Sequence, residues 1–134
     1  VSEGTIIRFN RQGESLSQKL TFMVTVMVQD IALDASGRLL VTDRGVNNQI
    51  LIYEQITGTP VLAKTFGTPG GIFAGPIVGE FGDLRFNNPM GVGAAAAGNL
   101  YVASSGSSAG ETGGGGGVDL SDDGFEAGLL QAVE

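Results

Sequence analysis

Two stretches of the chain repeat one another, and this repeat constrains the fold more than any other feature of the sequence. The segment 30–43, DIALDASGRLLVTD, is matched by the segment 91–104, GVGAAAAGNLYVAS. Each contains a short apolar strand, a turn that ends in glycine and a second apolar strand. A shorter match joins residues 5–9, TIIRF, to residues 49–53, QILIY. Strand units of this kind bury one face at a time, so each needs a neighbouring unit.

The spacing of these matches indicates a repeat of about 44 residues. The shorter match is offset by 44 residues and the longer one by 61, and the surplus falls in residues 67–88, a Gly- and Pro-rich stretch that we expect to be a long loop. Three or four short strands in about 44 residues are typical of a β-propeller blade. We therefore expect an all-β fold: an incomplete propeller of about two to three antiparallel, four-stranded blades, since 134 residues hold no more.

The apolar alternation places the individual strands of this expected propeller. We expect strands at residues 5–9, 20–28, 30–34, 38–42, 49–54, 61–66, 90–95 and 99–103, and no helix in residues 1–110. In this scheme residues 5–9 end one blade, residues 13–17 cross to the next, and Val61–Phe66 begins a further blade. The strand at 20–28 would place five apolar side chains on one face: Leu20, Phe22, Val24, Val26 and Val28.

The later copy of the repeat resembles the NHL repeat family. Pro89-Met-Gly-Val92 and Gly98-Asn-Leu-Tyr-Val-Ala103 match its pattern, with Ser104 where the family usually has Asp. The resemblance covers roughly residues 5–110 and implies a β-propeller, but it implies no particular chemistry, because such propellers do many unrelated jobs. The domains expected are propeller blades in residues 1–110 and a Gly-rich, acidic C-terminal segment in residues 111–134, which could begin a further blade.

Composition excludes several classes of function. The net charge is −7, and residues 111–134 carry six acids and no base, so the chain lacks the basic stripe that nucleic-acid binding requires. The longest apolar run, Phe22–Val28, is too short for insertion into a membrane. The Gly- and Ser-rich, Cys-free, acidic composition and the start at Val1 favour an extracellular or periplasmic protein. An incomplete propeller has to be a fragment, associate with itself or bind a protein partner.

No residue pattern predicts catalysis, a metal site or a cofactor. The chain has no His and no Cys, so the usual general base and thiolate nucleophile are missing. Asp34, Asp43 and the Asn47–Asn48 pair could offer oxygen ligands to a hard cation, but Asx residues at such positions more often accept hydrogen bonds within turns. The segment 119–124 resembles the front of a calcium loop, yet the position of its bidentate Glu is taken by Leu130.

The loop between residues 68 and 86 carries more apolar residues than a solvated loop needs. The binding residues expected on it are Ile72, Phe73, Ile77, Val78 and Phe81, although Phe81 and Phe86 could instead pack between blades. The function expected is a non-catalytic binding or structural module for protein–protein contact or assembly. The alternative is a fragment of a propeller enzyme, lyase or lactonase-like, whose catalytic residues lie outside these 134 residues.

Overall fold

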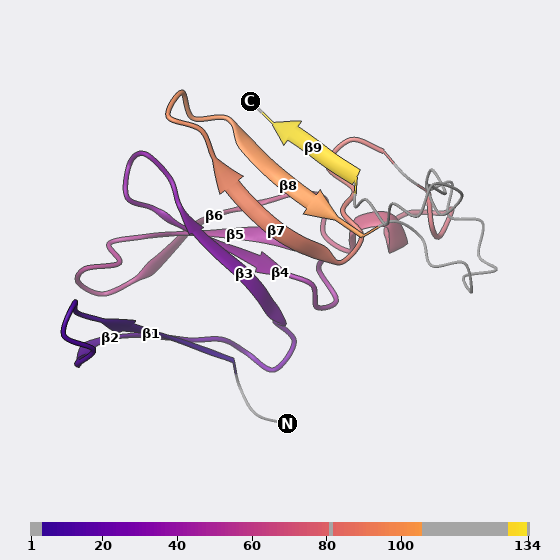
Figure 1. The fold of residues 1–134 in the computed structure, drawn as a ribbon. Helices are drawn as coiled ribbons and strands as arrows, with labels where there is room; N and C mark the ends of the chain where they lie inside the picture. The colour runs from indigo at the N-terminus through magenta and orange to yellow at the C-terminus, as the bar shows by residue number, and fades with distance from the viewer. Residues whose placement is uncertain (1–3, 81, 106–128, 134) are drawn as a thin grey trace, which may run out of the picture.

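The computed structural model describes residues 4–80, 82–105 and, by backbone alone, 129–133. This part of the chain is all-β (Figure 1). Its strands are β1 Thr5–Phe9, β2 Ser15–Thr21, β3 Val28–Leu33, β4 Leu39–Asp43, β5 Gln49–Glu54, β6 Val61–Phe66, β7 Pro89–Ala94, β8 Leu100–Ser104 and β9 Leu129–Val133. A three-residue 3₁₀ helix, η1 Gly71–Phe73, is the one helical element among the described residues.

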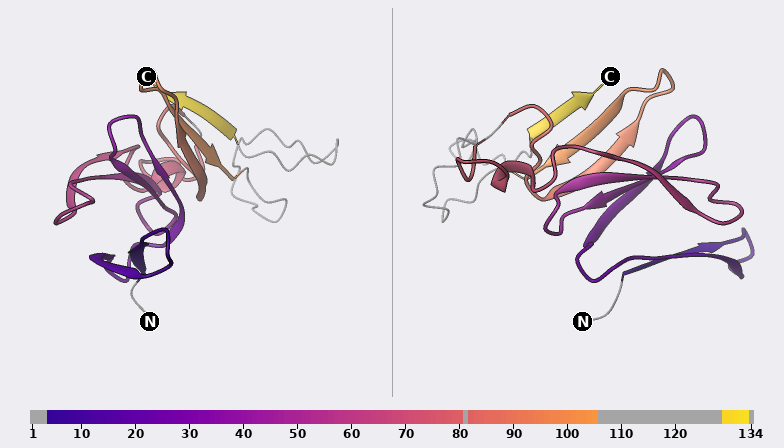
Figure 2. Two further views of the ribbon diagram at one scale, coloured as in Figure 1. Left: turned by 60° about the vertical axis from the view of Figure 1, so that its left-hand side comes forward. Right: turned by 180° about the vertical axis from the view of Figure 1, so that it is seen from behind.

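The strands form three antiparallel sheets that follow one another along the chain. Sheet 1 is β1–β2, sheet 2 is β3–β4–β5–β6 and sheet 3 is β7–β8–β9, each in sequence order. Sheet 2 lies between the other two, with sheet 1 on one face and sheet 3 on the other (Figures 1 and 2). The all-β class and a four-stranded antiparallel sheet are therefore confirmed, and the long loop is found between β6 and β7.

The strand expected at residues 20–28 is wrong. Phe22 closes the β1–β2 hairpin by donating its N–H to the carbonyl of Gly4 at 2.9 Å, and a turn follows in which Val26 donates to the carbonyl of Met23. Residues 15–21, part of which had been assigned to a crossing, instead form β2 opposite β1. Alternation of apolar residues does not reveal this turn, because Val26 and Val28 still pack against the core while Val24 lies exposed.

Val61–Phe66 ends a sheet and does not begin one. It forms β6, the fourth strand of sheet 2, and pairs with β5 through Ile50↔Phe66 and Glu54↔Val61. The turn between β5 and β6 has Gly58 donating its N–H to the carbonyl of Gln55 at 2.9 Å. Short hairpin connections of this kind join sequence neighbours in antiparallel sheets, so β6 stays with β5.

The core consists of two apolar clusters, one on each face of sheet 2. Toward sheet 1, Leu39, Val41 and Leu51 pack with Phe22 and with partly buried residues of β1 and β2. Toward sheet 3, the fully buried residues are Leu40, Ile50, Ile52, Phe86 and Val102. As a result β4 is buried along its whole length and β5 along its first four residues, which explains why these strands are nearly continuous apolar runs.

Antiparallel pairing sorts the connections to two ends of the molecule. The connections at residues 22–27, 44–48 and 67–88 lie at one end, which we call the loop end, to the right in Figure 1. The hairpin turns lie at the other end, the hairpin end, to the left in the same view; they are residues 10–14, 34–38, 55–60 and 95–99.

Candidate functional site

The three connections at the loop end are joined to one another by hydrogen bonds that involve backbone groups. Arg44 donates its N–H to the carbonyl of Met27 at 3.0 Å, which links the first connection to the second. The N–H groups of Met27 and Gly45 both donate to Oδ1 of Asp43, at 3.0 and 2.8 Å. Asp43 thus fixes two turns at once, as an Asx residue does.

Asp43 is fully buried, and its second carboxylate oxygen, Oδ2, has no hydrogen-bond partner in the described part of the chain. Its turn-forming bonds support the role in turns that was weighed against cation binding. The described residues also contain no group of three or more Asp, Glu, His or Cys side chains that could hold a metal ion.

The long loop is anchored on the connection between β4 and β5. Gly70 donates its N–H to the carbonyl of Asn47 at 2.8 Å, and Asn88 donates its N–H to Oδ1 of Asn48 at 2.8 Å. Gln49 completes the attachment by donating from Nε2 to the carbonyl of Gly67 at 2.7 Å. The Asn47-Asn48-Gln49 run therefore holds both ends of the loop by hydrogen bonds.

The interior of the loop is packed against Phe86. Ile72 is 1% exposed and donates its N–H to the carbonyl of Phe86, and its own carbonyl accepts the N–H of Gly79. Phe86 is fully buried in the cluster between sheets 2 and 3. Gly71 passes so close to Phe86 that an added Cβ would clash with the Phe86 carbonyl oxygen. The loop is therefore held in place over the core.

Apolar side chains are exposed on all three connections of the loop end. Phe73, Ile77 and Val78 of the long loop are 49, 59 and 60% exposed. We call the exposed set the apolar end surface, and it consists of Met23, Val24, Met27, Val46, Phe73, Ile77, Val78 and Leu84. Of the binding residues expected from the sequence, Phe73, Ile77 and Val78 are on this surface, Ile72 is in the interior, and Phe81 lies outside the described residues.

Sequence reasoning missed the contributions of the two shorter connections. Val24 was expected on the apolar face of a strand at residues 20–28, but it is 54% exposed in the turn between β2 and β3. No Gly or Pro marks that turn, so the sequence carries no local signal for it. Val46 sits between Gly45 and Asn47, where the flanking residues did indicate a turn.

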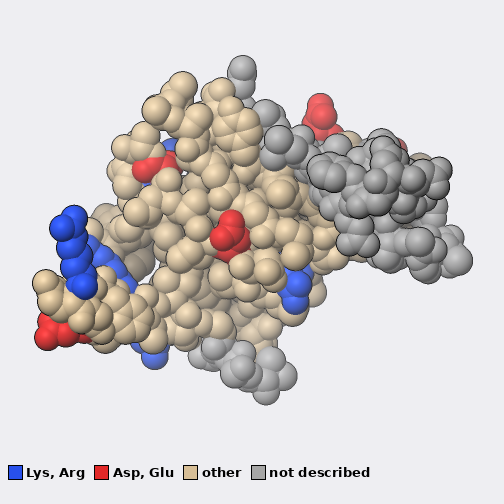
Figure 3. All heavy atoms as spheres, in the orientation of Figure 1, with Lys and Arg blue, Asp and Glu red and all other residues tan. Residues whose placement is uncertain are grey.

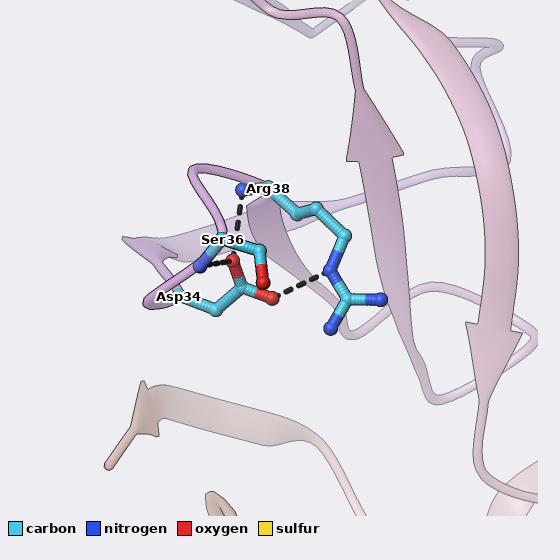
Figure 4. Close-up of polar contacts among 3 residues, drawn as sticks. All are labelled: Asp34, Ser36 and Arg38. Carbon is cyan, nitrogen blue, oxygen red and sulfur yellow. Dashed lines mark hydrogen bonds and ion pairs between the residues drawn. The ribbon is translucent and has the colours of Figure 1, made fainter. Parts of the chain in front are cut away.

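The hairpin end has a different character. Its β3–β4 turn is held by Asp34, whose Oδ1 accepts the N–H groups of Ser36 and Arg38 and whose Oδ2 pairs with Nε of Arg38 at 2.6 Å (Figure 4). Burial raises the pKa of Asp34, but the hydrogen bonds from Arg38 and Ser36 and the positive charge of Arg38 outweigh it, so the pKa lies below its usual value.

A hollow of about 390 Å³ lies beside this turn. Its lining is polar and comes from the β3–β4 and β5–β6 turns: Ser36, Gly37, Arg38, Glu54 and Gln55. Figure 3 shows Lys and Arg side chains around the β1–β2 hairpin at left. The hollow lies at the end of the molecule opposite the apolar end surface.

The chain matches no family model, no curated protein and no solved structure. None of the helices among the described residues has the length and apolar character needed to cross a membrane.

Proposed function

We propose that this chain is a non-catalytic binding module, built as part of an NHL-like β-propeller, that makes protein–protein contacts through the apolar end surface. The exposed apolar residues at the loop end carry this proposal. Single exposed apolar side chains need no explanation, but a group of them on neighbouring loops is a feature of interaction sites. Here eight exposed apolar residues come from three connections that hydrogen bonds join to one another.

The arrangement of sheets supports the propeller assignment. Three antiparallel sheets follow one another along the chain and pack face to face, with the complete one ordered β3–β4–β5–β6. Propeller blades are four-stranded sheets of this kind repeated around an axis. Binding loops of propellers lie at the ends of the blades, on a scaffold held rigid by the sheets. In the proposed propeller, the loop end would be one of these ends.

The test compares the proteins captured by three immobilised forms of the chain. The first is the wild type, and the second carries Phe73→Ser, Ile77→Ser and Val78→Ser. The matched control is Val61→Ser with Leu62→Ser, which removes exposed apolar side chains from the edge strand β6. Serine was chosen because it keeps the backbone hydrogen bonds of the loop. The melting temperature of each form checks that it is folded. We expect partners of the wild type to be retained by the control and lost by the loop variant.

Equal capture by all three forms would contradict the proposal. The alternative is a piece of a propeller enzyme, lyase or lactonase-like, whose catalytic residues lie outside this chain. That alternative predicts hydrolase or lyase activity once further blades are joined to this chain, and such activity would be unaffected by the three loop substitutions.

A further inference from the structure

The two ends of the chain carry complementary halves of one sheet. In sequence β1 repeats β5, and β7 and β8 repeat β3 and β4. Sheet 1 therefore holds only the last two strand positions of a four-stranded sheet like sheet 2, and β7–β8 hold the first two. Strands that correspond to the first two positions, β7 and β8, lie on the far side of sheet 2 (Figure 1).

The half-sheet β1–β2 has an unpaired edge along β1. Phe22 donates its N–H to the carbonyl of Gly4, so Gly4 and Phe22 form a hydrogen-bonded pair. Such pairs alternate with non-hydrogen-bonded pairs along an antiparallel ladder, so Ile6 and Leu20 form the next hydrogen-bonded pair. Thr5 and Ile7 alternate with them, and their N–H and C=O groups point away from β2. No strand of the described chain lies on that side. An unpaired edge of this kind is a template for another strand.

The strand that would take this edge by repeat symmetry is β8. In sheet 2, β4 pairs with β5 in the register Leu39↔Tyr53. In sheet 3, β8 pairs with β9 in the matching register, Leu100↔Val133. Because β1 repeats β5, it fits the same edge of β8, with Phe9 opposite Leu100 and Ile7 opposite Val102. Within one chain β9 occupies the position.

We propose that β1 of a second copy of this chain competes with β9 for the edge of β8, so that the β1–β2 hairpin of one copy completes sheet 3 of the next. This inference rests on the propeller assignment made above. Sheets 1 and 3 lie on opposite faces of sheet 2, so the pairing joins different copies head to tail. Each copy then adds one complete and one shared sheet, and a ring of about two to four copies has the four to eight blades of a propeller.

Apolar side chains left exposed in the single chain fit this pairing. Ile31 and Leu33 of β3 are 45 and 58% exposed on the face of sheet 2 that sheet 1 covers elsewhere. No strand of sheet 1 in the described part of the chain lies over them. A second copy's β7–β8, added beside β1, covers that area. The residues it brings there are Gly91, Gly93, Tyr101 and Ala103, mostly small, so a close approach is possible.

Charge favours the same partner. The β1–β2 hairpin carries Arg8, Arg11 and Lys19 against Glu14, a net charge of +2, whereas the whole chain is −7 and the remainder is therefore −9. A basic hairpin is attracted to the acidic remainder of another copy, and salt screens that attraction. An assembly formed this way weakens as the salt concentration rises.

The test uses the full chain and removes one N–H from the free edge. Ile7→Pro deletes the donor that points away from β2, so the hairpin keeps its own hydrogen bonds while the new pairing is blocked. Ile7→Val keeps the N–H and is the matched control. Thr5→Pro, at the start of the strand, is a second blocking variant in case Ile7→Pro does not fold. Size-exclusion chromatography with light scattering gives the mass of each, and circular dichroism confirms strand content.

We expect the wild type and Ile7→Val to form a discrete oligomer, and both proline variants to raise its dissociation constant about tenfold or more. A wild type that stays monomeric over a wide range of concentration overturns the inference, as does an oligomer that persists in both folded proline variants. If Phe73→Ser with Ile77→Ser and Val78→Ser dissolves the oligomer while the proline variants do not, the copies meet through the apolar end surface. The inference then fails and the proposed function stands.

Discussion

Asp34, Asp43 and Asn48 each accept hydrogen bonds from backbone N–H groups in connections, and these bonds fix where each connection lies. Asp34 holds the β3–β4 turn at the hairpin end. Asp43 and Asn48 hold the connections of the loop end, and Asn48 reaches across 40 residues to Asn88. Side chains that satisfy backbone donors are worth about 0.5–1.5 kcal/mol per hydrogen bond, more when the acceptor is charged. These residues therefore act on structure, and through it on the surface that the loops present.

The ionisation of Asp34 should appear in the pH dependence of stability. Its pKa is lowered in the folded chain, so the stability it contributes is complete above the unfolded value of about 3.9 and is lost as the pH falls through the lower, folded value. We expect Asp34→Asn to reduce the free energy of unfolding by about 0.5–1 kcal/mol at pH 7 and by progressively less below pH ~4. Urea unfolding over this pH range measures the difference.

Asp83→Asn is the control for this prediction, because Asp83 is exposed in the long loop. A gap between wild type and Asp34→Asn that stays constant down to the lowest pH would show that the carboxylate charge of Asp34 does not stabilise the turn.

At the scale of elements, most strands follow from the sequence and their grouping into sheets does not. The repeat placed six strands within a residue or two of β1, β3, β4, β5, β7 and β8, because alternating apolar residues and glycine turns act locally. The turn at residues 22–27 was missed because Phe22, Val24 and Val26 continue the apolar alternation through it. The sheet that β6 joins is decided by its pairing with β5. Residues 61–66 alone indicate a strand but not its partner.

The candidate site was predictable to the same degree. Composition alone pointed to Ile72, Phe73, Ile77, Val78 and Phe81, since a solvated loop needs few such residues. The burial of Ile72 depends on its hydrogen bond to Phe86 and on Gly79, fourteen and seven residues away along the chain. The turn at residues 22–27 lies beside the connection between β4 and β5 because Met27 donates its N–H to Asp43, which is 16 residues away along the chain. Contacts over such separations leave no periodic signal.

Gly71 tests how firmly the long loop is attached. Its φ of 55° is one that side chains rarely adopt, and a Cβ there meets the Phe86 carbonyl. We expect Gly71→Ala to lower the free energy of unfolding by about 1–3 kcal/mol and to speed proteolysis within residues 67–88. Gly58→Ala is the control, because its Cβ would meet only ordinary contacts; its effect should stay within about 0.5 kcal/mol. Equal effects of the two substitutions would mean that the loop yields easily.

At the scale of the whole molecule, stability depends on sheet 2, because both apolar clusters include its residues. We expect the backbone amides of β4 and β5 to be the slowest to exchange with deuterium, since both faces of these strands are buried and exposing them requires the clusters to open. Amides of β6, which is exposed along residues 61–65, should exchange sooner. Hydrogen exchange followed by mass spectrometry or NMR resolves this order; uniform protection across β4, β5 and β6 would contradict it.

The apolar end surface has a practical consequence. Exposed apolar side chains leave water at an air–water boundary, so we expect the chain to adsorb there with the loop end toward the air. Particles on an electron-microscopy grid would then share a narrow range of viewing directions, close to the strand direction. For the same reason, fluorophores and surface tethers belong on the hairpin end, at Ser36 or Thr57, where they leave the opposite end accessible.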